Sequence, residues 1–246
     1  MPDHAGERIY KGIPVSAGVC RGKILVIGKT ELAIPHHNLS DSELPHQVKR
    51  LEQAITQTRK QLVEVQHKVN EGLGAEDASI FDAHLLVLED RTLLDEVIRL
   101  IHQNKVNVEF AFHQVAERYA KTLSLMDDEY LRERASDMRD VTERILNNLI
   151  GRNEPIDLQN LKEPCIIISY DLAPSTTAVF DKKMVLGFGT DIGSKTSHTA
   201  IMARSLEIPA VVGLQKASQE LQTGDYALLD GYNGQIIINP TDQILF

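Results

Sequence analysis

The residues that could do chemistry lie together in the segment 193–204. Gly193 permits a tight turn of the backbone, and the hydroxyl of Thr196 or Ser197 can cap a helix that begins here. His198 then falls in the first turn of that helix, where unpaired N–H groups and the positive end of the helix dipole attract anions. An imidazole there is expected to stay neutral near pH 7 and can attack a phosphorus atom. The segment therefore predicts a histidine that carries a phosphoryl group.

The residues on either side of His198 must position it, and they predict an α/β arrangement. The apolar residues 184–189 are typical of a buried strand, and residues 199–206 predict a short helix that packs against a sheet. A strand, a glycine-bearing loop and a helix N-terminus commonly form an anion site at the edge of such a sheet. A cap or surface position remains the alternative for a single histidine near a helix start.

The segment resembles the phosphohistidine signature of the phosphoenolpyruvate-utilising enzymes. The similarity rests on Thr-Ser-His at 196–198, on Ala-Ile-Met-Ala-Arg at 200–204 and on Ile-Pro-Ala-Val-Val-Gly at 208–213. It implies a reversible phosphoryl group on the ring nitrogen of His198 that is distal to the backbone. The supporting phosphohistidine loop that it implies consists of Gly193, Lys195, Thr196, Ser197 and Arg204.

The sequence departs from the family pattern near this site. Ala173 stands where some members have a threonine whose hydroxyl binds the active histidine, so Thr176–Thr177 or backbone carbonyls are left to orient the ring. Lys195 replaces an arginine and keeps the positive charge without bidentate phosphate geometry. Arg204 lies about 240° around an ideal helix from His198, so a structural salt bridge remains an alternative to a phosphate contact.

Composition limits the possible partners and compartment. The 246 residues fit one large domain or two small ones, and the net charge of −9 with no tryptophan argues against nucleic acid and favours a basic protein partner. No apolar stretch approaches the ~20 residues of a membrane span, and the polar start lacks the features of a signal peptide. Cys20 and Cys165 are isolated, so we expect free thiols in a cytoplasmic protein that binds no membrane.

The chain changes character twice. Residues 9–28 predict short strands that are too few to form a sheet alone, so we expect them to join the strands predicted after residue 164. The stretch between them is helical in pattern. Its predicted helices cover residues 41–70, 76–103, 107–123 and 129–151. We therefore expect an α/β domain formed by 1–35 and 152–246, with a helical domain over 36–151 inserted into it.

The helical insert resembles that of the enzyme I branch of the family, which belongs to the bacterial sugar phosphotransferase system. Residues 80–90 and 127–140 carry this resemblance. It implies an α/β phosphohistidine (swivelling) domain with an inserted all-α four-helix domain that docks the phosphocarrier protein HPr. The implied docking surface comprises Glu76, His84, Leu86, Val87, Asp90, Leu123 and Arg134. Core or solvated positions remain alternatives for these residues, and helical spacing predicts that Leu86 or Val87 is exposed.

The same resemblance implies a phosphotransferase. His198 would take a phosphoryl group from phosphoenolpyruvate in the full-length enzyme and pass it reversibly to the active histidine of HPr. A C-terminal barrel missing from this chain would bind phosphoenolpyruvate with Mg²⁺ and form a homodimer, so we expect no cofactor here and a monomeric fragment. Two alternatives remain open: a nitrogen-regulatory paralogue with an HPr-like carrier, and a non-catalytic module that docks HPr.

Overall fold

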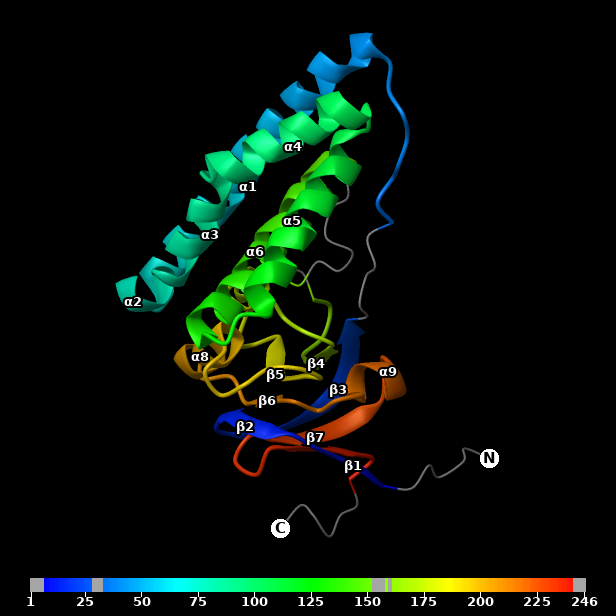
Figure 1. The fold of residues 1–246 in the computed structure, drawn as a ribbon. Coiled ribbons are helices and arrows are strands. Elements are labelled where there is room, and N and C mark those ends of the chain that lie inside the picture. Colours follow the sequence, from blue (N-terminus) through cyan, green and yellow to red (C-terminus); the bar gives the residue numbers. More distant parts are fainter. Residues whose placement is uncertain (1–6, 28–32, 152–157, 159–160, 241–246) are drawn as a thin grey trace. The chain divides into compact units, whose positions relative to one another are not determined.

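The computed structural model describes residues 7–27, 33–151, 158 and 161–240, and the side chain of residue 129 is not described (Figure 1). The chain divides into two compact units, one formed by 1–30 with 156–246 and the other by 31–155. The boundaries thus lie at 30 and 155, against 35 and 151 in the sequence-based expectation.

The α/β unit is built on a sheet with the strand order β1-β8-β7-β3-β4-β5-β6-β2. The N-terminal strands join later ones, as predicted: β1 pairs with β8, β2 pairs with β6, and β3 lies between β7 and β4. The strands are β1 (Arg8–Lys11), β2 (Ile13–Ser16), β3 (Val19–Ile27), β4 (Cys165–Ser169), β5 (Val185–Thr190), β6 (Ala210–Val212), β7 (Tyr226–Asp230) and β8 (Gln235–Ile238).

The parallel part of the sheet positions the candidate site. β3, β4, β5 and β6 run parallel, so their carboxyl ends meet at one edge. Ile166, Ile168 and Val211 on these strands are fully buried, which stabilises the unit by about 1.5–3 kcal/mol per side chain. Among the described residues, three short helices accompany this sheet: α7 (Pro174–Thr177), α8 (His198–Ser205) and α9 (Ala217–Glu220). α8 packs against α7, β2 and β6.

The helical unit consists of helices packed along their apolar faces. In the first helix the buried side chains recur at spacings of three and four residues, as packing along one face requires. They include Leu51, Ala54, Thr58, Leu62, Val65 and Val69. α6 packs against both the first helix and α5. The helices are α1 (Leu44–Gly72), α2 (Ala75–Ala78), α3 (Ile80–Leu88), α4 (Arg91–Asn104), α5 (Val108–Ser124) and α6 (Glu129–Ile150).

The single helix predicted over 76–103 is wrong, because the structure breaks it into α2, α3 and α4. The second break lies at Asp90, whose backbone is extended and whose carboxylate accepts the N–H of Leu93 at 3.1 Å. A capping side chain of this kind starts a new helix even where the apolar periodicity continues. At the first break the Ser79 hydroxyl donates to the carbonyl of Glu76 at 2.6 Å.

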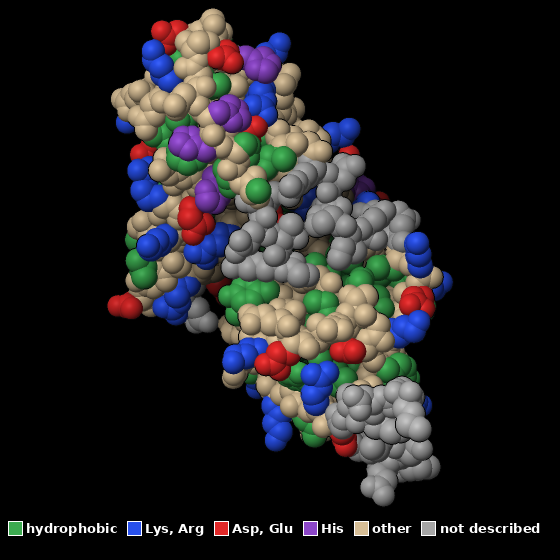
Figure 2. All heavy atoms as spheres, turned by 90° about the vertical axis from the view of Figure 1, so that its right-hand side faces the viewer, with side chains coloured by type: hydrophobic (Ala, Val, Ile, Leu, Met, Phe, Trp, Pro, Cys, Tyr) green, Lys and Arg blue, Asp and Glu red, His purple; other side chains and the backbone are tan. Residues whose placement is uncertain are grey.

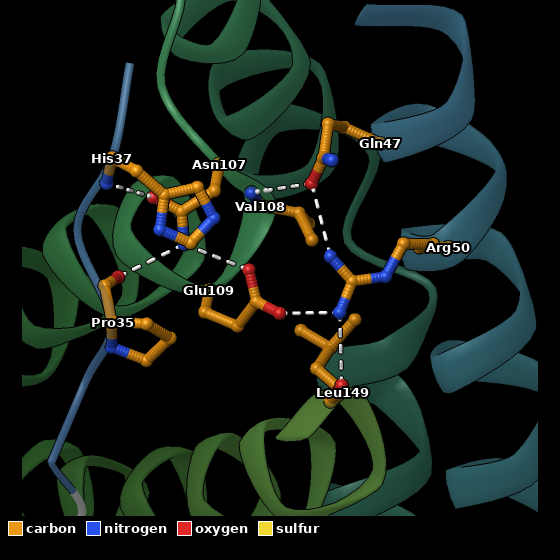
Figure 3. Close-up of polar contacts among 8 residues, drawn as sticks. All are labelled: Pro35, His37, Gln47, Arg50, Asn107, Val108, Glu109 and Leu149. Carbon is orange, nitrogen blue, oxygen red and sulfur yellow. Dashed lines mark hydrogen bonds and ion pairs between the residues drawn. The ribbon is translucent and has the colours of Figure 1, made fainter. Parts of the chain in front are cut away.

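A buried polar network fixes the segment that enters the helical unit (Figure 3). The side-chain amide of Asn107 donates to the Pro35 carbonyl at 2.9 Å and to Glu109 at 2.8 Å. Glu109 forms an ion pair with Arg50, which also donates to the Leu149 carbonyl near the end of α6 at 3.0 Å. The network therefore joins the entering segment to α1, α5 and α6.

Candidate functional site

The helix that carries His198 begins at that residue, which places His198 in the first turn as predicted, although the helix was expected to begin one residue later. Ser197 is its cap: the backbone is extended at φ −60° and ψ 150°, and its hydroxyl oxygen accepts the N–H of Ala200 at 3.3 Å. The same hydroxyl donates to the carbonyl of Ser194 at 3.0 Å. Of the two predicted caps, Ser197 therefore does the capping, and half-buried His198 occupies the first helical position. This is the position whose surroundings favour an anion.

The loop before His198 is held close to the sheet. Gly193 has φ +125°, and a Cβ atom there would lie 3.1 Å from Cβ of Val212, so the turn needs glycine. Asp191 is 3% exposed, and its carboxylate accepts the backbone N–H of Ser218 at 3.1 Å and the hydroxyl at 2.5 Å. Sequence reasoning missed Asp191, because its partner comes from a distant part of the chain.

Three further predicted residues shape the loop itself. The Thr196 and Ser194 hydroxyls lie 3.1 Å apart, and Lys195 is exposed. Nη1 of Arg204 donates to the Lys195 carbonyl at 3.1 Å and to the Val15 carbonyl at 3.3 Å. Arg204 thus ties the loop to β2 through backbone carbonyls, a contact that neither alternative for this residue included.

The segment around Ala173 lies against the first turn of α8. Thr199, the residue after His198, donates its hydroxyl to the carbonyl of Leu172 at 2.5 Å. Ala173 precedes α7, and its carbonyl accepts the hydroxyl of Thr177 at 3.1 Å. Because Thr177 is fully buried and bound there, it is a poor candidate for orienting the His198 ring. The hydroxyl of Thr199 was not predicted as part of the site.

The predicted docking residues of the helical unit differ in exposure. Leu86 is 56% exposed and Val87 is half-buried, which confirms that at least one of this pair reaches the surface. Glu76 is exposed, and Asp90, Leu123 and Arg134 are half-buried. One carboxylate oxygen of Asp90 is already engaged in capping α4.

His84 does not belong on a docking surface, and its predicted contact with a partner is wrong. Its side chain is fully buried, with Nε2 3.0 Å from Oδ2 of Asp140 and Nδ1 3.2 Å from the Ile80 carbonyl. The buried face of α3 runs through Phe81, His84 and Leu88. The spacing of these three residues is that of one helix face, so it predicts a buried His84 once a polar residue is accepted among the apolar ones.

Arg134 is held by its neighbour one helical turn earlier. Its Nε and Nη2 donate to the phenol oxygen of Tyr130 at 3.1 and 2.5 Å, and the guanidinium carbon lies 5.0 Å from the ring centre. Tyr130 is 59% exposed. The pair therefore presents a fixed cation at the surface of α6, and sequence reasoning had named only Arg134.

Histidine side chains gather at the upper end of the helical unit (Figure 2). Nevertheless, among the described residues no group of three or more His, Cys, Asp or Glu could hold a metal ion. Cys20 and Cys165 are free, as predicted, and burial raises the pKa of the Cys20 thiol to about 12. None of the described helices has the length and apolar character that crossing a membrane requires.

Comparison with known proteins identifies similar chains for both units. Residues 11–134 match the family model of the PEP-utilising enzyme N-terminal domain, and residues 161–234 match that of the mobile domain. The phosphoenolpyruvate-protein phosphotransferase of Haemophilus influenzae is 40% identical in sequence over an alignment that covers 95% of this chain. That of Bacillus subtilis is 42% identical over 94% of this chain. The chain spans 40% of the length of each of these relatives.

Solved structures show the same fold. An NMR solution structure of Enzyme I (nEIt) has a TM-score of 0.75 and 39% identity, covering 95% of this chain and 94% of that one. The N-terminal domain of Enzyme 1 - Nitrogen has a TM-score of 0.61 at 24% identity, covering 97% of this chain and 96% of that one, which shows a shared fold. The chain therefore belongs to the phosphoenolpyruvate-utilising enzymes and contains the N-terminal and mobile domains of that family.

Proposed function

We propose that this chain is the phosphoryl-carrying part of a phosphotransferase, in which His198 takes up a phosphoryl group and exchanges it with the active histidine of HPr. The observation that carries the proposal is the position of His198 as the first residue of α8, directly after a loop that the Ser197 cap fixes. The names of the relatives, which are phosphoenolpyruvate-protein phosphotransferases, support a phosphotransferase. The higher identity to Enzyme I than to its nitrogen counterpart favours the sugar branch.

The transfer is an in-line exchange between two histidines. Nε2 of His198 forms a bond to phosphorus while the bond from phosphorus to the HPr histidine nitrogen breaks, and the electron pair stays on that nitrogen. Positioning and charge stabilisation supply most of the catalysis in such a step. The amino end of α8 stabilises the phosphoryl oxygens, with Lys195 and Thr196 as additional contacts. Gly193, Ser197 and Arg204 keep the loop in place.

The proposed docking surface for HPr lies on the helical unit. The exposed Leu86 supplies an apolar centre, and exposed Glu76 and half-buried Asp90 supply negative charge around it. Such a surface suits a partner with an apolar centre and a basic rim. Val87, Leu123 and Arg134 complete the proposed surface.

The phosphoryl donor for the whole protein is proposed to be phosphoenolpyruvate. Because the chain spans 40% of its relatives, we assign the binding of phosphoenolpyruvate and Mg²⁺, and homodimer formation, to a C-terminal region outside this chain. This chain itself would act without a cofactor, as a monomer in the cytoplasm.

Phosphate exchange tests this division of labour. The chain is incubated with phosphorylated HPr, with and without EDTA, and separately with phosphoenolpyruvate and Mg²⁺ alone. We expect reversible exchange that EDTA does not slow, no labelling by phosphoenolpyruvate alone, and restored labelling when a separate C-terminal half is added. Binding of HPr without any exchange would indicate a non-catalytic docking module, and strict Mg²⁺ dependence of the exchange would refute the metal-free step.

A further inference from the structure

A series of hydrogen bonds leads from the sheet to the residue after His198. At the end of β4 the Ser169 hydroxyl donates to the Asp171 carbonyl at 2.7 Å. The Asp171 carboxylate accepts the N–H of Leu172 at 2.8 Å. The Leu172 carbonyl in turn accepts the hydroxyl of Thr199 at 2.5 Å. The first turn of α8 is therefore connected to a rigid strand through side chains and backbone.

The last bond in this series is buried. Thr199 is 7% exposed, and leaving a buried hydroxyl without its partner destabilises the folded protein. Its β-branched side chain is also restricted in rotation about its first torsion angle. Thr199 is thus held in one orientation against Leu172, beside the segment where Ala173 provides no hydroxyl.

His198 lies between two anchored neighbours. On one side, the Ser197 hydroxyl is bound to the carbonyl of Ser194 in the loop. On the other side, Thr199 is bound to Leu172. Successive residues of a helix are about 100° apart around its axis, so fixing the residues before and after His198 fixes the direction in which its side chain leaves the backbone.

We propose that Thr199 is a positioning residue for phosphoryl transfer, whose hydroxyl sets the orientation of His198 in the absence of a threonine at position 173. The inference rests on the proposed phosphorylation of His198. A side chain that holds a reacting group in its productive geometry changes the rate of the chemical step more than the affinity for the partner. Thr199 should therefore influence kcat rather than KM.

Three variants test this role. Thr199→Val removes the hydroxyl at nearly constant shape, Thr199→Ala removes it without adding a methyl group beside the Leu172 carbonyl, and Thr199→Ser keeps it. Steady-state exchange with phosphorylated HPr gives kcat and KM, and ¹⁵N NMR of the His198 ring reports its environment. Thermal unfolding shows whether each variant is folded.

We expect Thr199→Val to lower kcat about 10- to 100-fold with KM for HPr unchanged within about twofold, and to shift the His198 ring signals. Thr199→Ser should restore most of kcat. If Thr199→Val does not fold, Thr199→Ala takes its place as the variant without the hydroxyl, and the same loss of kcat is expected. Unchanged kcat in a folded variant without the hydroxyl, or a serine variant as slow as the valine variant, would overturn the inference. Failure of the unaltered chain to exchange phosphate would instead refute the proposed function.

Discussion

His84 on α3 and Asp140 on α6 form a buried hydrogen bond of 3.0 Å between Nε2 and Oδ2. A second carboxylate oxygen, Oδ1 of Asp137, lies 4.0 Å from the same nitrogen. The pair joins the helix that carries Leu86 to the helix that carries Arg134. Although His84 is excluded from direct contact with a partner, it therefore holds two parts of the proposed docking surface together.

The stability of this contact depends on pH. Burial, the largest influence, lowers the pKa of His84, but the hydrogen bond to Asp140 and the charges of Asp140 and Asp137 outweigh it and raise the pKa above its usual 6.5. The stabilisation is thus fully present below the unfolded-state pKa and is lost as pH rises through the higher folded-state pKa. We expect hydrogen exchange of the α3 and α6 amides to show a free energy of opening that falls as the pH rises through the folded-state pKa of His84.

His84→Gln is the control for this titration, since glutamine can still donate a hydrogen bond but does not titrate near neutral pH. In this variant the fall in opening free energy with rising pH should be absent. The same slope in the variant and the unaltered chain would assign the pH dependence to another group.

The ion pair of Arg50 and Glu109 should matter more to stability than an exposed pair of the same kind. Glu109 has a side chain only 5% exposed and forms part of the network around Asn107. We expect Glu109→Ala to lower the free energy of unfolding of the helical unit by about 3 kcal/mol, because it leaves a charge without its partner. Urea unfolding followed by helical circular dichroism measures this change.

A matched variant comes from the exposed pair of Arg59 and Glu89, whose N–O distance is 2.7 Å and whose side chains are 41% and 55% exposed. Glu89→Ala should cost less than about 1 kcal/mol, since water screens the pair. Equal losses in the two variants would show that the network in Figure 3 adds nothing beyond a surface ion pair.

The docking surface is tested by two substitutions, one at exposed Leu86 and one at half-buried Arg134. We expect Leu86→Ala or Arg134→Glu to weaken HPr binding by about 1–3 kcal/mol, the range for interface anchors, without altering folding. NMR titration of labelled HPr gives the affinity. Val63→Ala is the control. Val63 is on α1 and is also exposed, at 47%, but it is not one of the residues of the proposed surface. Unchanged affinity in both test variants would exclude α3 and α6 as the docking site for HPr.

Tyr130 should contribute to docking through Arg134. Tyr130→Phe keeps the ring under the guanidinium but removes the oxygen that accepts both of its hydrogen bonds. We expect HPr binding to weaken by about 0.5–1.5 kcal/mol in this variant, with unfolding unchanged because the side chain is exposed. Unchanged affinity in the same titration would show that Tyr130 does not contribute to HPr docking through Arg134.

Local patterns predicted the strands, the capped start of α8 and the position of His198, because each depends on residues that are close in sequence. The break at Asp90 escaped prediction, since a side-chain cap competes with apolar periodicity that runs through it. His84 was misplaced because a paired polar residue can occupy an apolar stripe. The bond of Thr199 was not predictable, since its partner Leu172 lies 27 residues earlier.

In the proposed function His198 alone carries the phosphoryl group, and mapping the modified residue is the sharpest test of that role. The chain is phosphorylated with phosphorylated HPr, digested at alkaline pH and analysed by mass spectrometry of its peptides. We expect a single phosphoryl group on His198 that is stable in base and labile in acid, and none in His198→Ala. A phosphoryl group that survives in His198→Ala, or that maps to another residue such as His84, would show that His198 is not the sole phosphoryl carrier.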